Sequence, residues 1–192
     1  MGLLDRDALL AMGFAEVGED VRISDRASFY GTERIGLGDR VRIDDFCILS
    51  AGEGGISLGS HIHVAAYSSL IGAGAIAVED FANISSRVSI YSSSDDYSGR
   101  TLTNPMVADE YKNVHHASVR IGRHVIVGSG SVVLPGVTLR EGAAIGALSL
   151  VRDDCEPFGI YAGVPATFRG ERKRDLLALE QQYLQARSGG TR

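Results

Sequence analysis

Aliphatic residues recur every six positions along most of this chain of 192 residues. The frame is clearest towards the C-terminal end, at Ile121, Val127, Val133, Leu139, Ile145 and Val151. Four positions after each of them stands a small or medium-sized residue: Val125, Ser131, Val137, Ala143, Ser149 and Cys155. An α-helix turns every 3.6 residues and cannot keep a six-residue repeat on one face. The spacing therefore predicts a repeat architecture in which stacked coils share one core.

The same frame extends upstream in triplets whose members are six residues apart. The triplets are Val17, Ile23 and Phe29; Leu37, Ile43 and Leu49; Leu58, Val64 and Leu70; and Val78, Ile84 and Ile90. Successive triplets start 20, 21 and 20 residues apart, so two or three residues beyond three hexads fall at the same place in each coil. We predict six triangular coils of three short strands, with the additional residues at one corner.

The repeat is interrupted once, because the frame that ends at Ile90 resumes only at Ile121. We predict a single domain with an N-terminal helix at 1–16, a β-helix at 17–168 with an inserted loop at 91–118, and a C-terminal helix and tail at 169–192. The inserted loop has a mixed composition with aromatic residues, which favours an ordered, functional segment. Both helices are expected to cap the coils or to contact other subunits.

Composition restricts the class of protein further. The 44% of hydrophobic residues excludes a disordered chain, and a net charge of −5 disfavours nucleic-acid binding. No apolar run is long enough to cross a membrane, and the N-terminus lacks the features of a signal peptide. Cys47 and Cys155 fall at core positions, which favours a reduced, cytoplasmic protein. The chain contains 24 glycines. Many are expected in or beside the hexads, where coils turn sharply, including Gly18, Gly38, Gly59, Gly122, Gly128, Gly142 and Gly146.

Two stretches of sequence resemble a known family. VIVGSGSVVLPGVTLREGAAIGALSLV, followed by IYAGVPATFRGER, is similar to the ending of galactoside and maltose O-acetyltransferases. The segments IDDFCILSAGEGGI, HVAAYSSLIG, SSRVSIYSSSDDYSG and TNP resemble the GDP-perosamine N-acetyltransferase branch. The resemblance implies an all-β, left-handed parallel β-helix of hexapeptide repeats and a homotrimer with active sites between subunits. It further implies acetyl-CoA as co-substrate, no metal, and transfer to the amino group of a nucleotide-linked amino-deoxy sugar in O-antigen or polysaccharide synthesis.

The candidate proton-handling residues are His63, His116 and Asp95, in that order. Galactoside-type acetyltransferases use a histidine in the inserted loop as base, and the hexad frame places Asp95 there. Asp95 can act as a base if burial raises its pKa, or it can hold a loop turn. A neutral amine attacks unaided and loses its proton afterwards, so this departure favours an amino acceptor over a hydroxyl.

The other candidates divide between sugar and coenzyme. His63 and Asn83 hold equivalent places in successive coils and should stack on one outward face. Sugar contacts are assigned to Asn83, Asp96, Tyr97 and Asn104, although a solvated turn explains Asp96 and Asn104 equally well. The resemblance assigns coenzyme A contacts to Ser129, Ala147, Arg152, Arg169 and Lys173. His61 and His124 are expected at the surface.

Three alternatives remain open at this point. The first is O-acetylation of a sugar hydroxyl by a galactoside- or maltose-type enzyme. The second is a γ-carbonic-anhydrase-like metal enzyme, which needs three converging histidines, such as His63, His116 and His124 brought together across subunits. The third is a solenoid without catalytic activity. The AGVPA ending at 162–166 argues against the metal enzyme.

Overall fold

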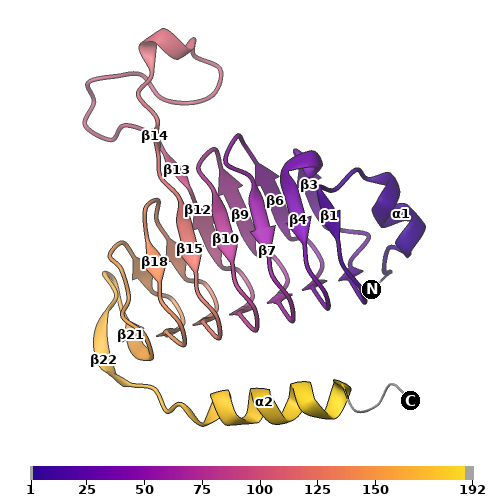
Figure 1. Cartoon of the computed structure of the whole chain (residues 1–192). Coiled ribbons are helices and arrows are strands. Elements are labelled where there is room, and N and C mark those ends of the chain that lie inside the picture. The colour runs from indigo at the N-terminus through magenta and orange to yellow at the C-terminus, as the bar shows by residue number, and fades with distance from the viewer. Residues whose placement is uncertain (1, 189–192) are drawn as a thin grey trace.

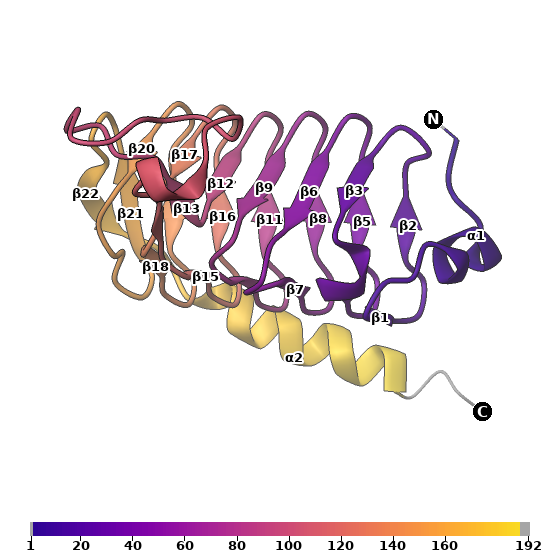
Figure 2. The same ribbon diagram turned by 90° about the horizontal axis from the view of Figure 1, so that it is seen from above.

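The computed structural model describes residues 2–188, which form a triangular parallel β-helix flanked by two helices (Figures 1 and 2). Three sheets make the sides of the prism, and the strands of successive coils pair in parallel, with only the last strand of the second sheet antiparallel within the described residues. The predicted fold class is thus confirmed.

The strands of each sheet follow one another along the prism. The first sheet contains β1 (Glu16–Val17), β4 (Ile35–Leu37), β7 (Ile56–Leu58), β10 (Ile76–Val78), β15 (Val119–Ile121) and β18 (Thr138–Leu139). The second sheet contains β2 (Arg22–Ile23), β5 (Arg42–Ile43), β8 (His63–Val64), β11 (Asn83–Ile84), β16 (Ile126–Val127), β19 (Ala144–Ile145), β21 (Gly159–Ala162) and β22 (Thr167–Glu171). The third sheet contains β3 (Ser28–Tyr30), β6 (Ile48–Ala51), β9 (Ser69–Gly72), β12 (Ser89–Tyr91), β17 (Val132–Val133) and β20 (Leu150–Val151).

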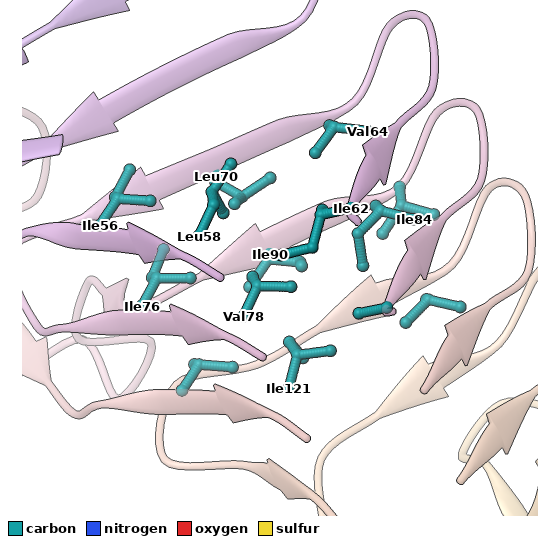
Figure 3. Close-up of a cluster of buried hydrophobic side chains, with 14 of the residues drawn as sticks. Ile56, Leu58, Ile62, Val64, Leu70, Ile76, Val78, Ile84, Ile90 and Ile121 are labelled. Atoms are coloured by element: carbon teal, nitrogen blue, oxygen red, sulfur yellow. The ribbon is translucent and has the colours of Figure 1, made fainter. Parts of the chain in front are cut away.

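The core is the stack of hexad residues that the sequence predicts. From Ile23 to Val151 the aliphatic hexad residues are no more than 4% exposed, apart from Phe29, which is half-buried like Val17 in the first coil. Figure 3 shows side chains from several coils pointing into the same interior. Cys47 and Cys155 are buried and free, as predicted. Burial of so much aliphatic surface is the main stabilising contribution in such a solenoid.

The prism extends one partial coil beyond the six predicted. The added strand is β21, which pairs in parallel with β19 and then turns back into antiparallel β22. The tight AGVPA segment makes this turn, so the ending that resembles acetyltransferases is the closing hairpin of the β-helix. Residues 167–171, part of which we assigned to the C-terminal helix, are therefore a strand.

Glycine has a different role from the one we expected. Of the seven glycines assigned to sharp turns, only Gly142 has a positive φ, and residues such as Phe46 and Tyr67 adopt left-handed backbone at the corners instead. Gly38 and Gly128 allow neighbouring coils to approach: a Cβ there would lie 2.6 Å from the Gly59 carbonyl oxygen and 2.5 Å from the Ala147 nitrogen. The excess of glycine thus reflects the tight stacking of coils.

Both helices are shorter than predicted. Helix α1 spans Arg6–Ala11, with the Asp5 carboxylate accepting a hydrogen bond from the Ala8 N–H, and it buries Leu9. Helix α2 spans Asp175–Ser188 and runs back along a flank of the prism rather than across its end (Figure 2). Among residues 2–188, neither helix has the length and apolar character needed to span a membrane.

The segment after β12 leaves the prism as a projecting loop (Figure 1). Its base is a pair of antiparallel strands, β13 (Ser93–Ser94) and β14 (His115–His116), and a short 3₁₀ helix at Asp109–Tyr111 lies within it. The β13–β14 ladder fixes the direction in which the loop departs from the prism.

Candidate active site

A polar cluster occupies the outward face of the second sheet. The His63 Nε2 lies 2.8 Å from one oxygen of Asp44, whose other oxygen accepts a hydrogen bond of 2.7 Å from the Arg42 Nε. The Asp44 side chain is only 15% exposed, and burial opposes its charge. The hydrogen bonds from His63 and Arg42 outweigh that effect and lower the pKa of the Asp44 carboxyl. The ionised carboxylate requires His63 to donate from Nε2, so neutral His63 has its lone pair on Nδ1.

Asn83 lies directly beside His63, because the two residues are register partners in β11 and β8. Ser85, two residues after Asn83 and half-buried, donates its backbone N–H to the Val127 carbonyl. Its hydroxyl makes no hydrogen bond with any residue in the described range 2–188. The predicted stacking of His63 and Asn83 is therefore present, and Asp44 and Ser85 enlarge it.

The base of the loop holds His116 in place. The Ser93 hydroxyl accepts a hydrogen bond of 2.7 Å from the Ala73 N–H and lies 2.7 Å from the His116 Nδ1. The Ser93 hydroxyl can donate to this nitrogen or accept from it, depending on the tautomer of His116. In either tautomer the Nδ1 of His116 is engaged by Ser93.

The remaining loop candidates have different surroundings. Asp95 and Tyr97 are exposed and, with Asp96 and Thr103, line a shallow cavity of about 150 Å³. The burial on which we made the base role of Asp95 conditional is therefore not supplied by this single chain. Asp96 accepts hydrogen bonds from the Ser98 N–H and the Thr101 hydroxyl, and these bonds lower the pKa of Asp96. The turn-holding role considered for Asp96 is therefore present in the structure.

Asn104, nine residues after Asp95 in the same loop, also stabilises a turn. It has a φ of +77° and accepts a hydrogen bond from the Met106 N–H on its side-chain oxygen. Asparagine tolerates left-handed backbone better than most residues do. This local bond is what a solvated turn predicts, and it leaves the amide N–H groups of Asn104 for other partners.

The coenzyme candidates lie in the last coils. Ser129 and Ala147 are exposed at equivalent positions of consecutive coils, and the Ser129 carbonyl accepts a hydrogen bond from the Leu148 N–H. The Arg152 guanidinium pairs with Asp153, and the Arg169 guanidinium donates to the Ala162 carbonyl. Lys173 is exposed and has no ion pair within residues 2–188.

The prediction that His61 and His124 lie at the surface is wrong. His124 is 8% exposed, and its Nε2 contacts Glu180 of α2 at 2.7 Å. The His61 ring stacks on Phe81 at 4.5 Å and is half-buried. Helix α2 covers this corner, and its position along the flank follows from tertiary packing that the hexad frame does not encode.

Comparison with known proteins gives a match over nearly the whole chain. A dTDP-4-amino-4,6-dideoxy-D-glucose acyltransferase of Escherichia coli is 57% identical over 183 residues, which is 95% of each chain. The chain belongs to the hexapeptide-repeat acyltransferases. No protein-family model matches it.

This acyltransferase is also similar in structure to a solved N-acyltransferase. AntD, an N-acyltransferase from Bacillus cereus solved with dTDP and 3-hydroxybutyryl-CoA, is 42% identical with a TM-score of 0.92, over 97% of this chain and 98% of AntD. A variant of AntD solved with dTDP-4-amino-4,6-dideoxyglucose and coenzyme A has a TM-score of 0.91 at 42% identity, over 96% and 97% of the two chains. Other solved forms of AntD have one aspartate or one serine substituted.

The histidines of this acyltransferase do not form a metal site within the described residues. No group of three or more His, Cys, Asp or Glu side chains in residues 2–188 is arranged to hold a metal ion. His63, His116 and His124 are bound instead to Asp44, Ser93 and Glu180. The three histidines of the metal-enzyme alternative therefore have separate roles within one chain.

Sequence reasoning missed Asp44, Arg42 and Ser85. In the hexad frame Asp44 follows the inward Ile43 by one residue, and His63 precedes the inward Val64 by one residue. These two positions point outward from adjacent strands and are diagonal neighbours. The frame contained enough information to find the pair, had outward positions been compared between coils.

Proposed function

We propose that this protein is an acetyl-CoA-dependent N-acetyltransferase that acts on the 4-amino group of a dTDP-linked 4-amino-4,6-dideoxy sugar. The observation that carries the proposal is the 57% identity to an acyltransferase of that substrate, which extends over 95% of both chains. The complexes of AntD with dTDP, the amino sugar nucleotide and coenzyme A give further support. We place the reaction in the cytoplasm, where it supplies an acetylated amino sugar for polysaccharide such as O-antigen.

The arrangement of the candidates supports a homotrimer with shared sites. His63 and Asn83 lie on the second sheet, whereas Asp95 belongs to the loop that leaves the third sheet. In our proposal, the loop of one subunit extends over the second sheet of a neighbour. A three-sided prism suits threefold packing, since each prism offers one face to each partner.

Asp95 is proposed as the group that receives the amine proton. In AntD the substituted serine precedes the substituted aspartate by ten positions, and Ser85 precedes Asp95 here by the same number. The two AntD positions are numbered one lower than Ser85 and Asp95. This spacing supports a functional role for both residues.

The chemistry requires the protein to position the amine and to accept one proton from it. The neutral sugar amine attacks the thioester carbonyl, forming a C–N bond and a tetrahedral intermediate whose collapse breaks the C–S bond. One amine proton passes to Asp95 and then to the departing thiolate sulfur, so the products are an amide and the coenzyme A thiol. Asn83 and Ser85 provide N–H and O–H donors next to the reacting groups, and His63 Nδ1 offers an acceptor for the substrate.

The coenzyme is proposed to lie along the last coils, beside Ser129 and Ala147. The absence of large side chains at Gly128 and Gly146 lets a pantetheine arm approach the backbone. Arg152, Arg169 and Lys173 lie near the end of the prism and suit the phosphates of the coenzyme.

The proposal is tested by a thiol-release assay with purified protein and acetyl-CoA. We expect turnover with dTDP-4-amino-4,6-dideoxyglucose and none with the matching sugar nucleotide that has a hydroxyl at C4. The GDP-linked amino sugar tests the nucleotide, and 3-hydroxybutyryl-CoA tests the acyl group. Acetylation of hydroxyl acceptors alone would establish the O-acetyltransferase alternative instead.

Replacing Asp44 by asparagine is expected to lower kcat about tenfold with little change in KM. The asparagine amide can donate to His63 Nε2, which moves the proton of neutral His63 to Nδ1 and removes the free lone pair. Nitrogen-15 NMR of histidine-labelled protein should show this exchange of protonated and unprotonated ring nitrogens.

The matched control for that variant is Asp20→Asn. Asp20 also accepts from an arginine, Arg22, but contacts no histidine in the described structure. Its replacement should leave kcat and the His63 signals unchanged. Unaltered His63 signals in Asp44→Asn would refute the role of Asp44.

A further inference from the structure

The outward face of the second sheet changes from polar to apolar between β11 and β16. One row of register partners runs along this face, in the order Arg42, His63, Asn83, Ile126, Ala144 and Ile160. The first three side chains carry hydrogen-bonding groups, whereas the last three consist of hydrocarbon. The change falls between Asn83 and Ile126, where the candidate active site gives way to the coils that we assign to the coenzyme.

Ile126 takes no part in the stack of inward residues. It precedes Val127 in β16, and Val127 is completely buried in the core. Because side chains alternate between the two faces of a strand, Ile126 points outward. It is half-buried, and its backbone N–H donates to the Ala143 carbonyl within the ladder of stacked coils. Part of its apolar surface is therefore presented to whatever binds on this face of the sheet.

A second row runs beside the first, two residues further along each coil. It contains Ser85, Gly128 and Gly146, which hold equivalent positions in three successive coils. In the coenzyme path proposed above, the pantetheine arm lies over the two glycines, and its thioester meets the amine near Ser85. Residues two apart along an extended chain are separated by roughly 7 Å, so Ile126 and Ala144 lie directly beside this path.

The thioester carbon has a sulfur, an oxygen and an acyl chain attached to it, and each needs a place. The sulfur belongs to the pantetheine arm over Gly128, and the carbonyl oxygen takes the hydrogen-bond donors of Asn83 and Ser85. The acyl chain then extends over Ile126, where apolar surface meets apolar surface. The polar neighbour on the other side of Asn83 is His63, which suits the amine and the sugar instead.

We propose that Ile126 limits the length of the acyl group, an inference that rests on the proposed function. Its β-branched side chain is stiff at χ1 and forms a firm floor beneath the acyl group. The methyl group of acetyl packs on this floor, whereas the additional carbons of butyryl meet the isoleucine branches. One methylene more or less in an apolar pocket changes kcat/KM by roughly tenfold to two-hundredfold. The enzyme is thereby selective for acetyl-CoA over longer acyl-CoA molecules.

The test compares kcat/KM for acetyl-CoA, propionyl-CoA and butyryl-CoA with the dTDP-linked amino sugar as acceptor. For the unaltered protein we expect butyryl-CoA to react at least tenfold less efficiently than acetyl-CoA. Ile126→Ala removes more carbon than butyryl adds to acetyl, so it should bring these two values within about threefold of each other. The conservative variant Ile126→Val should favour propionyl-CoA more than butyryl-CoA.

Calorimetric titration of acetyl-CoA and butyryl-CoA in the absence of any acceptor gives an independent readout. The unaltered protein should bind acetyl-CoA with a Kd several-fold lower than that for butyryl-CoA. Ile126→Ala should bind the two with similar Kd values, because the space that the longer chain needs is then open.

Ile160→Ala is the matched control, because Ile160 is a half-buried isoleucine of the same row, two coils beyond Ile126. It should keep the acyl preference of the unaltered protein. The inference fails if the unaltered protein binds and transfers butyryl as well as acetyl, or if both Ile126 variants keep the original preference. A protein that distinguishes the two acyl-CoA molecules in binding but acetylates no amino sugar refutes the proposed function and leaves the role of Ile126 in place.

Discussion

Replacing Asp95 by asparagine is expected to lower kcat for amine acetylation by about two to three orders of magnitude. Asparagine keeps the size of the side chain but cannot accept the amine proton as the C–N bond forms. KM for acetyl-CoA should stay unchanged, because the coenzyme candidates lie on the last coils rather than on the loop. Steady-state kinetics with dTDP-4-amino-4,6-dideoxyglucose and acetyl-CoA measures both quantities.

The control for this variant is Asp109→Asn within the same loop. The Asp109 side chain is fully exposed and pairs only with Lys112, so its replacement should leave kcat within about twofold. If Asp95→Asn retains at least a third of the original kcat, the proton must pass elsewhere. The unoccupied Nδ1 of His63 then becomes the group to test, because the Nδ1 of His116 is engaged by Ser93.

The scaffold could be predicted because the hexad repeat is a local signal. Apart from Phe29, each inward residue from Ile23 in the first coil to Val151 in the last full coil is buried in the same way, so one rule places these residues. The loop could be located for the same reason, since it is where the rule stops. The frame also placed His63 beside Asn83, because register partners in stacked coils occupy equivalent hexad positions.

The repeat does not encode how the non-repeating segments pack against the prism. The burial of His124 depends on Glu180, which lies 56 residues later on a helix that packs along the flank. The pairing of Asp44 with His63 involves outward side chains of adjacent coils, and the frame locates it only when outward positions are compared between coils. The position of Asp95 relative to His63 depends, in our proposal, on a second copy of the chain.

Leu70→Ala is expected to cost about 3 kcal/mol in the free energy of unfolding, with an effect on stability far larger than any surface change. Leu70 is fully buried in the third coil, in register with Leu49 on one side and Ile90 on the other. Both neighbouring coils are held by their own backbone ladders, so the cavity cannot close by collapse. Chemical denaturation at a fixed protein concentration measures the loss, since subunit association contributes to apparent stability.

Leu148→Ala is the control, because it makes the same substitution at an exposed position. Leu148 is 74% exposed at a corner, and the same truncation there should change the free energy of unfolding by no more than about 0.5 kcal/mol. Both variants remove the same atoms, so the difference between their free energies of unfolding measures the contribution of burial. Equal losses at both positions would show that stability does not come from the inward stack, and would contradict the account of the β-helix core given above.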